Sequence, residues 1–294
     1  MQAYAATLRD QQKAVPPSPK PMPPLDRDKA TPPLHSAAAQ VGGSANVVIE
    51  IGSVPTKYYV QKAFLVHYSD YFRKALSGTW KEAEDGVVKL VDVEPAVFNL
   101  FLEWLYTQQV PNDCSEYNRI ANAGLKFSFS NTGDLWKIKL YVFVDRFAVP
   151  TLRTALNRQI VNDPDAISRI TWDHITITYA FDNLPSTDPL LDLFVDRYYM
   201  EWNGWGSMQS LPHDFLHRFL QRVGGERARG RKVVSEMFKM DFCIYHEHAT
   251  DAEKSSCSHK SSLGDGNLAL MRPIRSETRL QSMFFSSRPA TSAS

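Results

Sequence analysis

The sequence predicts an α+β fold in which a small β-sheet is capped by helices and followed by a mostly helical extension. Three observations lead to this fold class. Two runs within residues 46–60 alternate as strands with one buried face do. Residues 62–76 carry apolar side chains at helical steps, and a third strand-like run precedes an apolar helix that ends near residue 106. Helical periodicity then continues to about residue 240.

The first two strands are indicated by alternation and by a turn between them. Val47, Ile49 and Ile51 alternate along the chain with Val48, Glu50 and Gly52. The segment 52–56 has the composition of a turn, and residues 58–60 begin a strand that pairs with the first. We therefore expect a hairpin that buries one face.

A helical pair, a third strand and a buried helix follow the hairpin. The helical pattern begins at Lys62, and Gly78 marks its end. Residues 87–91 predict the third strand. Pro95 is suited to the first position of the next helix, which has almost no polar face and is therefore expected inside the domain.

Several segments in this order resemble the BTB/POZ family, particularly its short fungal members. Residues 59–65 (YVQKAFL) are similar to the family's aromatic-x-His-Lys-x-x-Leu, and residues 69–76 (SDYFRKAL) are similar to its Ser-x-Tyr-Phe helix. Residues 80–83 (WKEA) and 98–107 (FNLFLEWLYT) resemble its Phe-Lys-Glu-Ala and Phe-x-x-x-Leu-x-Trp-Leu-Tyr-Thr segments, and residues 140–152 resemble the end of the domain. The resemblance implies the BTB/POZ fold and a role in protein–protein interaction.

Two positions depart from the family pattern. Asn46 stands where the family usually has Asp, and Gln61 stands where it usually has His. In dimeric members the Asp and the following basic residue form a buried charged pocket. Here Lys62 would face a neutral amide instead.

The resemblance implies two kinds of partner. A homodimer would bury Val47, Ile49 or Ile51 against a second copy, as strand-exchanged relatives do. A cullin scaffold of a ubiquitin ligase would instead meet a hydrophobic residue and a Glu before the third strand, where Trp80 and Glu82 stand. The chain would then be a scaffold or a substrate adaptor, with a transcription-associated or nucleic-acid-binding regulator as the alternative and an enzyme as the least favoured class.

The amino-acid composition limits the kinds of partner and the cellular compartment to be expected. Lys and Arg number 33 against 32 Asp and Glu among 294 residues, so the net charge of +1 gives no argument for nucleic acid or an anionic membrane. Three cysteines are too few for a disulfide framework, and no apolar run reaches the roughly 20 residues that span a bilayer. We expect an intracellular protein of the cytoplasm or nucleus.

The pattern divides the chain into five parts. The prolines of residues 1–44 predict a disordered tail. The BTB/POZ-like domain covers 45–161, with a polar loop insertion at about 111–133, and a helical extension covers 162–240. A segment with Cys and His covers 241–260, and a second disordered tail covers 261–294.

No catalytic motif stands in this sequence. It has no Gly-rich phosphate loop, no GxSxG and no HExxH, which argues against an enzyme. A basic cluster is favoured as a solvated loop over a nucleic-acid site because aromatic residues are not interleaved with it. Its members are Arg222, Arg227, Arg229, Arg231 and Lys232.

The one group of side chains with metal-binding chemistry lies near the end of the chain. Thiolate and imidazole are the ligands that zinc prefers, and four of them make a closed tetrahedral site. The five candidates are Cys243, His246, His248, Cys257 and His259. The expected set is Cys243, one of His246 and His248, Cys257 and His259, and the expected role is structural.

Overall fold

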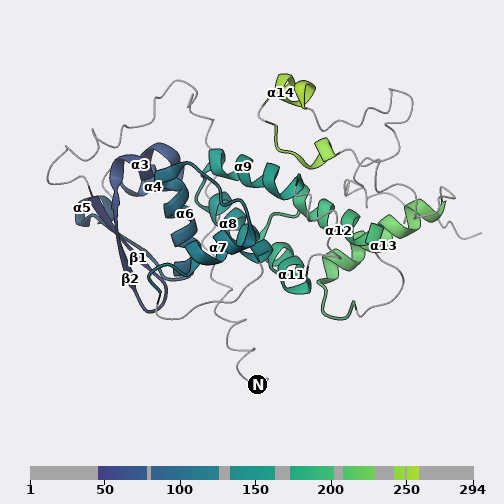
Figure 1. The fold of residues 1–294 in the computed structure, drawn as a ribbon, viewed down its shortest axis with the longest axis horizontal. Helices are drawn as coiled ribbons and strands as arrows, with labels where there is room; N and C mark the ends of the chain where they lie inside the picture. Colours follow the sequence, from purple (N-terminus) through teal and green to yellow (C-terminus); the bar gives the residue numbers. More distant parts are fainter. Residues whose placement is uncertain are drawn as a thin grey trace, which may run out of the picture.

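The computed structural model of the chain describes residues 46–77, 81–125, 133–162, 173–201, 208–228, 242–248 and 250–257. Within these ranges a small sheet stands at one end of an elongated body, and α13 (His213–Ala228) lies at the other end (Figure 1). This is the α+β arrangement that the sequence predicts. None of the helices in these ranges combines the length and the hydropathy that crossing a bilayer requires.

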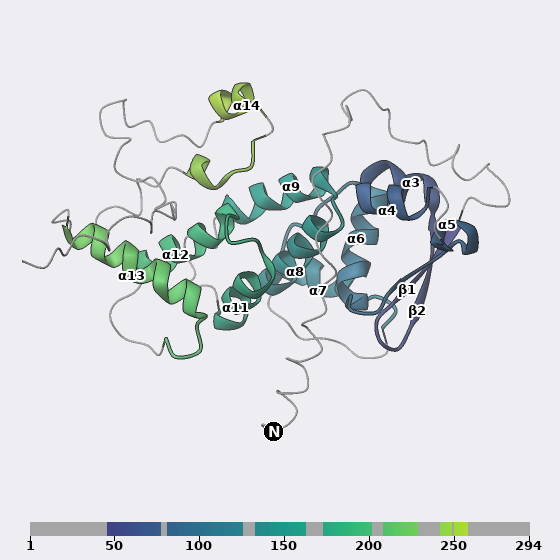
Figure 2. The ribbon, with the colours of Figure 1, turned by 180° about the vertical axis from the view of Figure 1, so that it is seen from behind.

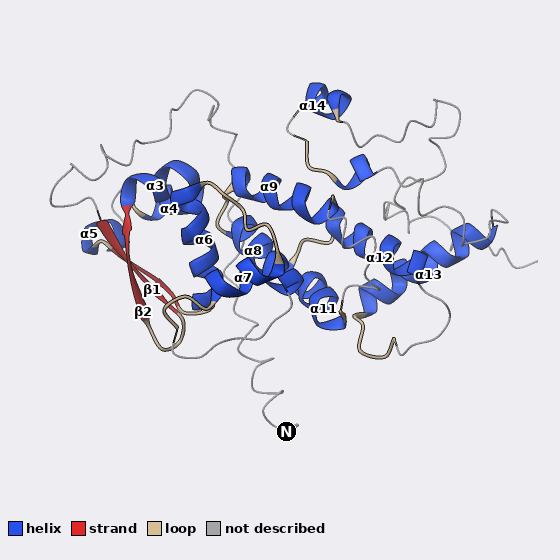
Figure 3. Cartoon of the chain, in the orientation of Figure 1, coloured by secondary structure: helices blue, strands red, loops and turns tan. Residues whose placement is uncertain are grey.

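The sheet has three strands in the order β2-β1-β3 within the described part of the chain (Figure 3). They are β1 (Asn46–Ile51), β2 (Thr56–Gln61) and β3 (Val87–Leu90). β1 pairs antiparallel with β2 and parallel with β3. The hairpin turn begins at Gly52, whose φ of +87° is a conformation that an L side chain rarely adopts.

Two short helices and a third one connect β2 to β3. α3 (Lys62–Tyr68) ends at Ser69, and α4 (Asp70–Ala75) begins there, which confirms the predicted helical pair. The buried Ser69 hydroxyl accepts a hydrogen bond from the Phe72 N–H at 3.1 Å and donates one to the Phe147 carbonyl at 2.7 Å. It therefore caps α4 and ties it to the later helices. α5 (Lys81–Asp85) leads into β3.

The centre of the domain is α6 (Pro95–Thr107), with Pro95 at its start as the sequence indicates. Its buried aromatic side chains meet rings from α4 and from the later helix α8 (Gly133–Arg146). The rings in contact are Phe72, Phe98, Phe101, Phe143 and Phe147. This packing joins the sheet end of the molecule to the helical body.

The predicted loop at 111–133 is wrong for part of its length. The structure has a helix, α7 (Cys114–Ala121), which packs on α6 and α8. The side chain of Asp113 caps it by accepting from the Glu116 N–H at 2.9 Å. Only Tyr117, Ile120 and Ala121 are buried, so the helix is short and mostly polar, and its apolar stripe is easily missed in the sequence.

The remaining helices continue the body away from the sheet (Figure 2). They are α8 (Gly133–Arg146), α9 (Pro150–Val161), α11 (His174–Asn183), α12 (Pro189–Glu201) and α13 (His213–Ala228). α9 and α12 begin at prolines, as expected from their fixed φ. One hydrophobic core runs from Val47 in β1 to Phe219 in α13 and Tyr245 beyond it. The extension is thus continuous with the domain.

The last described segment folds back onto this body. It contains the 3₁₀ helix η4 (Phe242–Tyr245) and α14 (Asp251–Ser256). η4 packs against α12, and both views place it on the side of α9 and α12 (Figures 1 and 2). The predicted disordered tails, 1–44 and 261–294, lie outside the described residues.

Candidate interaction surfaces and a candidate metal centre

The inner face of the sheet belongs to the core of the chain itself. Val47, Ile49 and Ile51 are buried there against the helices. Their assignment to a partner surface is therefore corrected, because the side chains that a sheet turns toward its own helices cannot also reach another molecule. The alternation of the strand leaves the opposite face for a partner.

The outer face of the sheet presents one apolar row and one charged row. Val48 lies in register with Tyr59 of β2 and Val87 of β3, and Tyr59 is 72% exposed. In the next row Glu50 lies between two lysines: its carboxylate is 3.6 Å from Lys57 Nζ and 3.4 Å from Lys89 Nζ. A solvated aromatic beside two half-buried valines is the composition expected of a contact surface rather than of a polar exterior. The lysines and Glu50 form its charged border.

The α4–α5 face contains the second candidate contact. Trp80 lies outside the described residues, whereas Glu82 is half-buried on α5. Tyr71 on α4 is 37% exposed, and its ring contacts those of Phe72 and Phe147. Burial raises the pKa of Tyr71, while nearby Arg146 lowers it and Glu82 and Asp92 raise it further. Tyr71 is therefore a partly exposed aromatic ring whose pKa responds to the charge of Glu82.

The basic cluster is partly explained by the packing of the extension. Arg222 is buried on α13, and its Nε lies 2.8 Å from a carboxylate oxygen of Asp196 on α12. It therefore neutralises a buried carboxylate and is not available to a phosphate. Arg229, Arg231 and Lys232 lie outside the described residues, and the side chain of Arg227 is likewise not described.

Arg153 on α9 holds the C-terminal segment in place. Its Nη2 lies 2.6 Å from Glu247 and 2.7 Å from Asp188, and its Nη1 binds Asp145. Tyr141 stacks under the guanidinium at 4.6 Å and donates its hydroxyl to Glu247 at 2.7 Å. Burial raises the pKa of Asp188, and Arg153 opposes that rise. No local sequence pattern signals this network, because its members are spread over more than 100 positions.

Two further contacts fix the backbone of the same segment on α9 and α12. The side-chain amide of Asn157 donates to the Tyr245 carbonyl at 3.0 Å and accepts from the Glu247 N–H at 2.9 Å. The buried hydroxyl of Tyr245 donates to Asp196, and burial together with that carboxylate raises the pKa of Tyr245. The turn after η4 is thereby set in one conformation.

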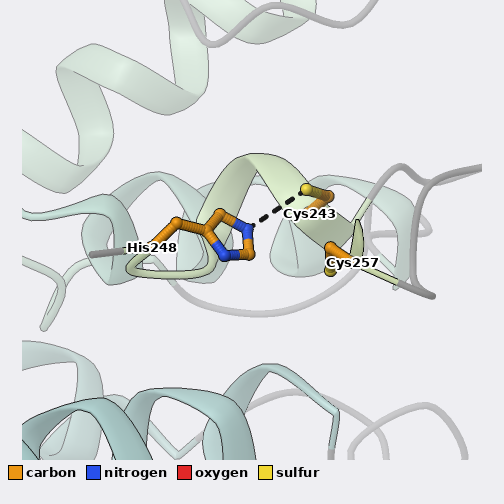
Figure 4. Close-up of side chains that lie close together, drawn as sticks. All are labelled: Cys243, His248 and Cys257. Carbon is orange, nitrogen blue, oxygen red and sulfur yellow. Dashed lines mark hydrogen bonds between the residues drawn. The ribbon is translucent and has the colours of Figure 1, made fainter. Parts of the chain in front are cut away.

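The turn and the end of α14 bring three of the predicted zinc ligands together. One ligand atom from each of Cys243, His248 and Cys257 lies within 4.8 Å of the others. Cys243 Sγ is 3.3 Å from His248 Nε2, with Cys257 beside them (Figure 4). His246 approaches through Cys257, whose Sγ is 3.4 Å from its Nδ1. His259 lies outside the described residues.

Of the two histidines that the sequence leaves open as a ligand beside Cys243, His246 is the nearer along the chain. The structure pairs Cys243 with His248, because a 3₁₀ turn, closed by the His246 N–H to the Cys243 carbonyl at 3.3 Å, directs His246 toward α9. There His246 Nε2 lies 2.9 Å from Asn162 Oδ1.

Comparison with known proteins identifies the first part of the fold. The family model described as the BTB/POZ domain matches residues 41–140. The chain is also 35% identical over 69 residues to BTB and MATH domain-containing protein 15 of Caenorhabditis elegans. That alignment covers 24% of this chain and 24% of the relative, so the chain spans about a quarter of the curated relative's length. Residues 41–140 therefore form a BTB/POZ domain, a module of protein–protein interaction.

Proposed function

We propose that this chain is a non-enzymatic scaffold whose BTB/POZ domain pairs with a second copy through the outer face of the sheet. The exposed Tyr59, in register with Val48 on the free side of the sheet, is the observation that carries the proposal. Exposed tyrosines contribute strongly to interfaces because they bury a large area at a small entropic cost. The row of Lys57, Glu50 and Lys89 carries both signs of charge, so a two-fold related copy can offer carboxylate to ammonium.

Light scattering on the full chain tests this pairing. The expected mass is twice 33.3 kDa, and Tyr59→Ser should shift the protein toward the monomer. Ile175→Ser is the matched control, because Ile175 is 69% exposed but lies on α11, away from the sheet. A wild-type monomer at roughly 50 μM, above the dissociation constants of ordinary transient pairs, would refute self-association.

A second candidate function is that of an adaptor on a cullin scaffold. Two side chains support it: Tyr71 on α4 is partly exposed, and the charge of Glu82 on α5 raises the pKa of Tyr71. An accessible aromatic ring and a carboxylate suit a docking contact. Such a role is compatible with dimerisation because the two faces are formed by different elements. We also infer that the chain is of the short fungal type and works inside the cell, where its three cysteines remain reduced.

A pull-down with a cullin tests the adaptor role. Glu82→Lys should abolish capture, whereas Glu84→Lys, an exposed position on the same short helix, should leave it unchanged. Trp80→Ala combined with Glu82→Ala should have the same effect as Glu82→Lys if Trp80 shares the face. Circular dichroism of each variant separates loss of contact from loss of fold, and failure of the wild type to bind any cullin would end the adaptor proposal.

A further inference from the structure

The proposed interaction role does not involve the Cys and His side chains of residues 242–257. We propose that Cys243, His248 and Cys257, with His246 as the fourth ligand, bind a structural zinc ion that fastens α14 to the helical body. The inference stands independently of the proposed function, because the cluster lies on η4, on the turn that follows it and on the C-cap residue of α14, all outside residues 41–140.

The distances within the Cys243–His248 pair and within the Cys257–His246 pair are those of ligands that share one ion, and it is through Cys257 that His246 is linked to the other three. Sulfur at about 2.3 Å and nitrogen at about 2.0 Å from a tetrahedral zinc are about 3.5 Å apart. The two sulfur–nitrogen distances in the structure are 3.3 Å and 3.4 Å. Cys243, His248 and Cys257 need only small rotations to meet one ion, since their ligand atoms already lie within 4.8 Å of one another.

The tautomer of His246 is set by a residue outside the cluster. Its Nε2 lies 2.9 Å from the Oδ1 of Asn162, an atom that can only accept, so Nε2 carries the proton. The lone pair of the neutral ring is then on Nδ1, which is the atom that faces Cys257. Zinc-binding histidines characteristically donate their second ring N–H in this way, which orients the ring and raises its basicity.

The two segments that carry the ligands are placed by contacts that do not involve the ligands. Asn157 and Arg153 hold the turn that follows η4, and Arg158 on α9 pairs with Glu253 on α14. A site built on positioned segments loses less chain entropy when the metal binds. Because four protein ligands leave no open position, the ion would stabilise the fold rather than activate a substrate.

Zinc content of the full chain, purified without a histidine tag under reducing conditions, tests the proposal. The wild type should contain about one zinc per chain, and Cys243→Ser and Cys257→Ser should each reduce this toward zero. Cys114→Ser and His213→Ala are the matched controls, because Cys114 stands at the start of α7 and His213 at the start of α13. Both controls should retain the metal.

A second measurement keeps the test decisive where a variant fails to fold. Reduced wild-type protein, stripped of metal by a chelator and then given Co²⁺, should show the visible absorption of tetrahedral cobalt with thiolate ligands, and added zinc should abolish it. Zinc should also slow proteolysis within 242–257. Absence of metal after reconstitution, or a disulfide between Cys243 and Cys257 in protein that takes up no zinc once reduced, would overturn the proposal.

Two histidine variants decide the fourth ligand. His246→Ala should lower zinc affinity by at least about tenfold, while His259→Ala should leave it unchanged. The reverse result would refute the assignment of His246 and place His259 in the site.

Discussion

The Arg153 network offers the sharpest test of how the C-terminal segment is held. Arg153→Met keeps the length of the side chain and removes the charge and the hydrogen-bond donors. Asp188 then remains in the core with its side chain 0% exposed and without its cationic partner. We expect the free energy of unfolding to fall, because an uncompensated buried carboxylate is far costlier than a lost surface pair.

The magnitude follows from the exposure of the partners. Removing one partner of a fully buried pair costs about 3–5 kcal/mol. Arg153 is 18% exposed, and Glu247 and Asp145 are partly exposed, so water screens part of the interaction. We therefore expect a loss of about 2–4 kcal/mol. For a folded body of this size that corresponds to a fall of about 6–12 °C in Tm, taking 3 kcal/mol as the midpoint.

Urea denaturation of the wild type, Arg153→Met and a matched variant measures this loss. Arg158→Met is the control, since Arg158 lies on the same helix and pairs with the same segment through Glu253, but is 51% exposed. It should lose less than about 1 kcal/mol. Adding Asp188→Asn to Arg153→Met should recover part of the loss, because the buried charge is then gone. Equal effects of Arg153→Met and Arg158→Met would refute the reasoning.

The same variant should change the dependence of stability on pH. Burial raises the pKa of Asp188 in the folded state, so this group favours folding below its unfolded pKa and loses that contribution as the pH rises through the folded pKa. Without Arg153 the folded pKa rises further. The loss caused by Arg153→Met should therefore be larger at about pH 8 than at about pH 4, and a loss independent of pH would contradict this account.

Three further substitutions test local features of the fold. Ser69→Ala should lower the free energy of unfolding, measured with urea, by about 1–2 kcal/mol, because it removes the cap of α4 and a buried hydrogen bond. Its control, Ser53→Ala in the exposed hairpin turn, should lower it by less than about 0.5 kcal/mol. Tyr245→Phe should cost about 1–3 kcal/mol, because it removes the hydroxyl that donates to the buried carboxylate of Asp196, which still pairs with Arg222. Tyr59→Phe, with a solvated hydroxyl, should be neutral, and equal effects of the two variants would refute the buried hydrogen bond. Gly52→Ala should destabilise the fold by about 1–2 kcal/mol, because alanine is strained at the positive φ of this position, and Tm should fall accordingly. An unchanged Tm would contradict this strain.

The domain could be predicted from the sequence because local patterns carry it. The alternation around Val47 and the helical steps after Lys62 each reflect one buried face, and such periodicity is readable from a few neighbouring residues. Pro95 marks a helix start for the same local reason. The zinc-ligand types were readable as well, since Cys and His within a short span have a distinct chemistry.

Tertiary structure alone decided which surfaces of the sheet are exposed and which candidate zinc ligands lie close together. The alternation of apolar residues shows that one face of β1 is buried, but not whether helices of the same chain or a partner cover it. In the structure the chain's own helices cover Ile49, and the outer face with Tyr59 is exposed. The mostly polar helix α7 becomes apparent only from its packing against α6 and α8. Arg153 binds carboxylates from distant positions that no local pattern connects. Likewise, a 3₁₀ turn and the return of α14 bring His248, rather than His246, to Cys243, because the path of the backbone and not the spacing along it sets the distance between side chains.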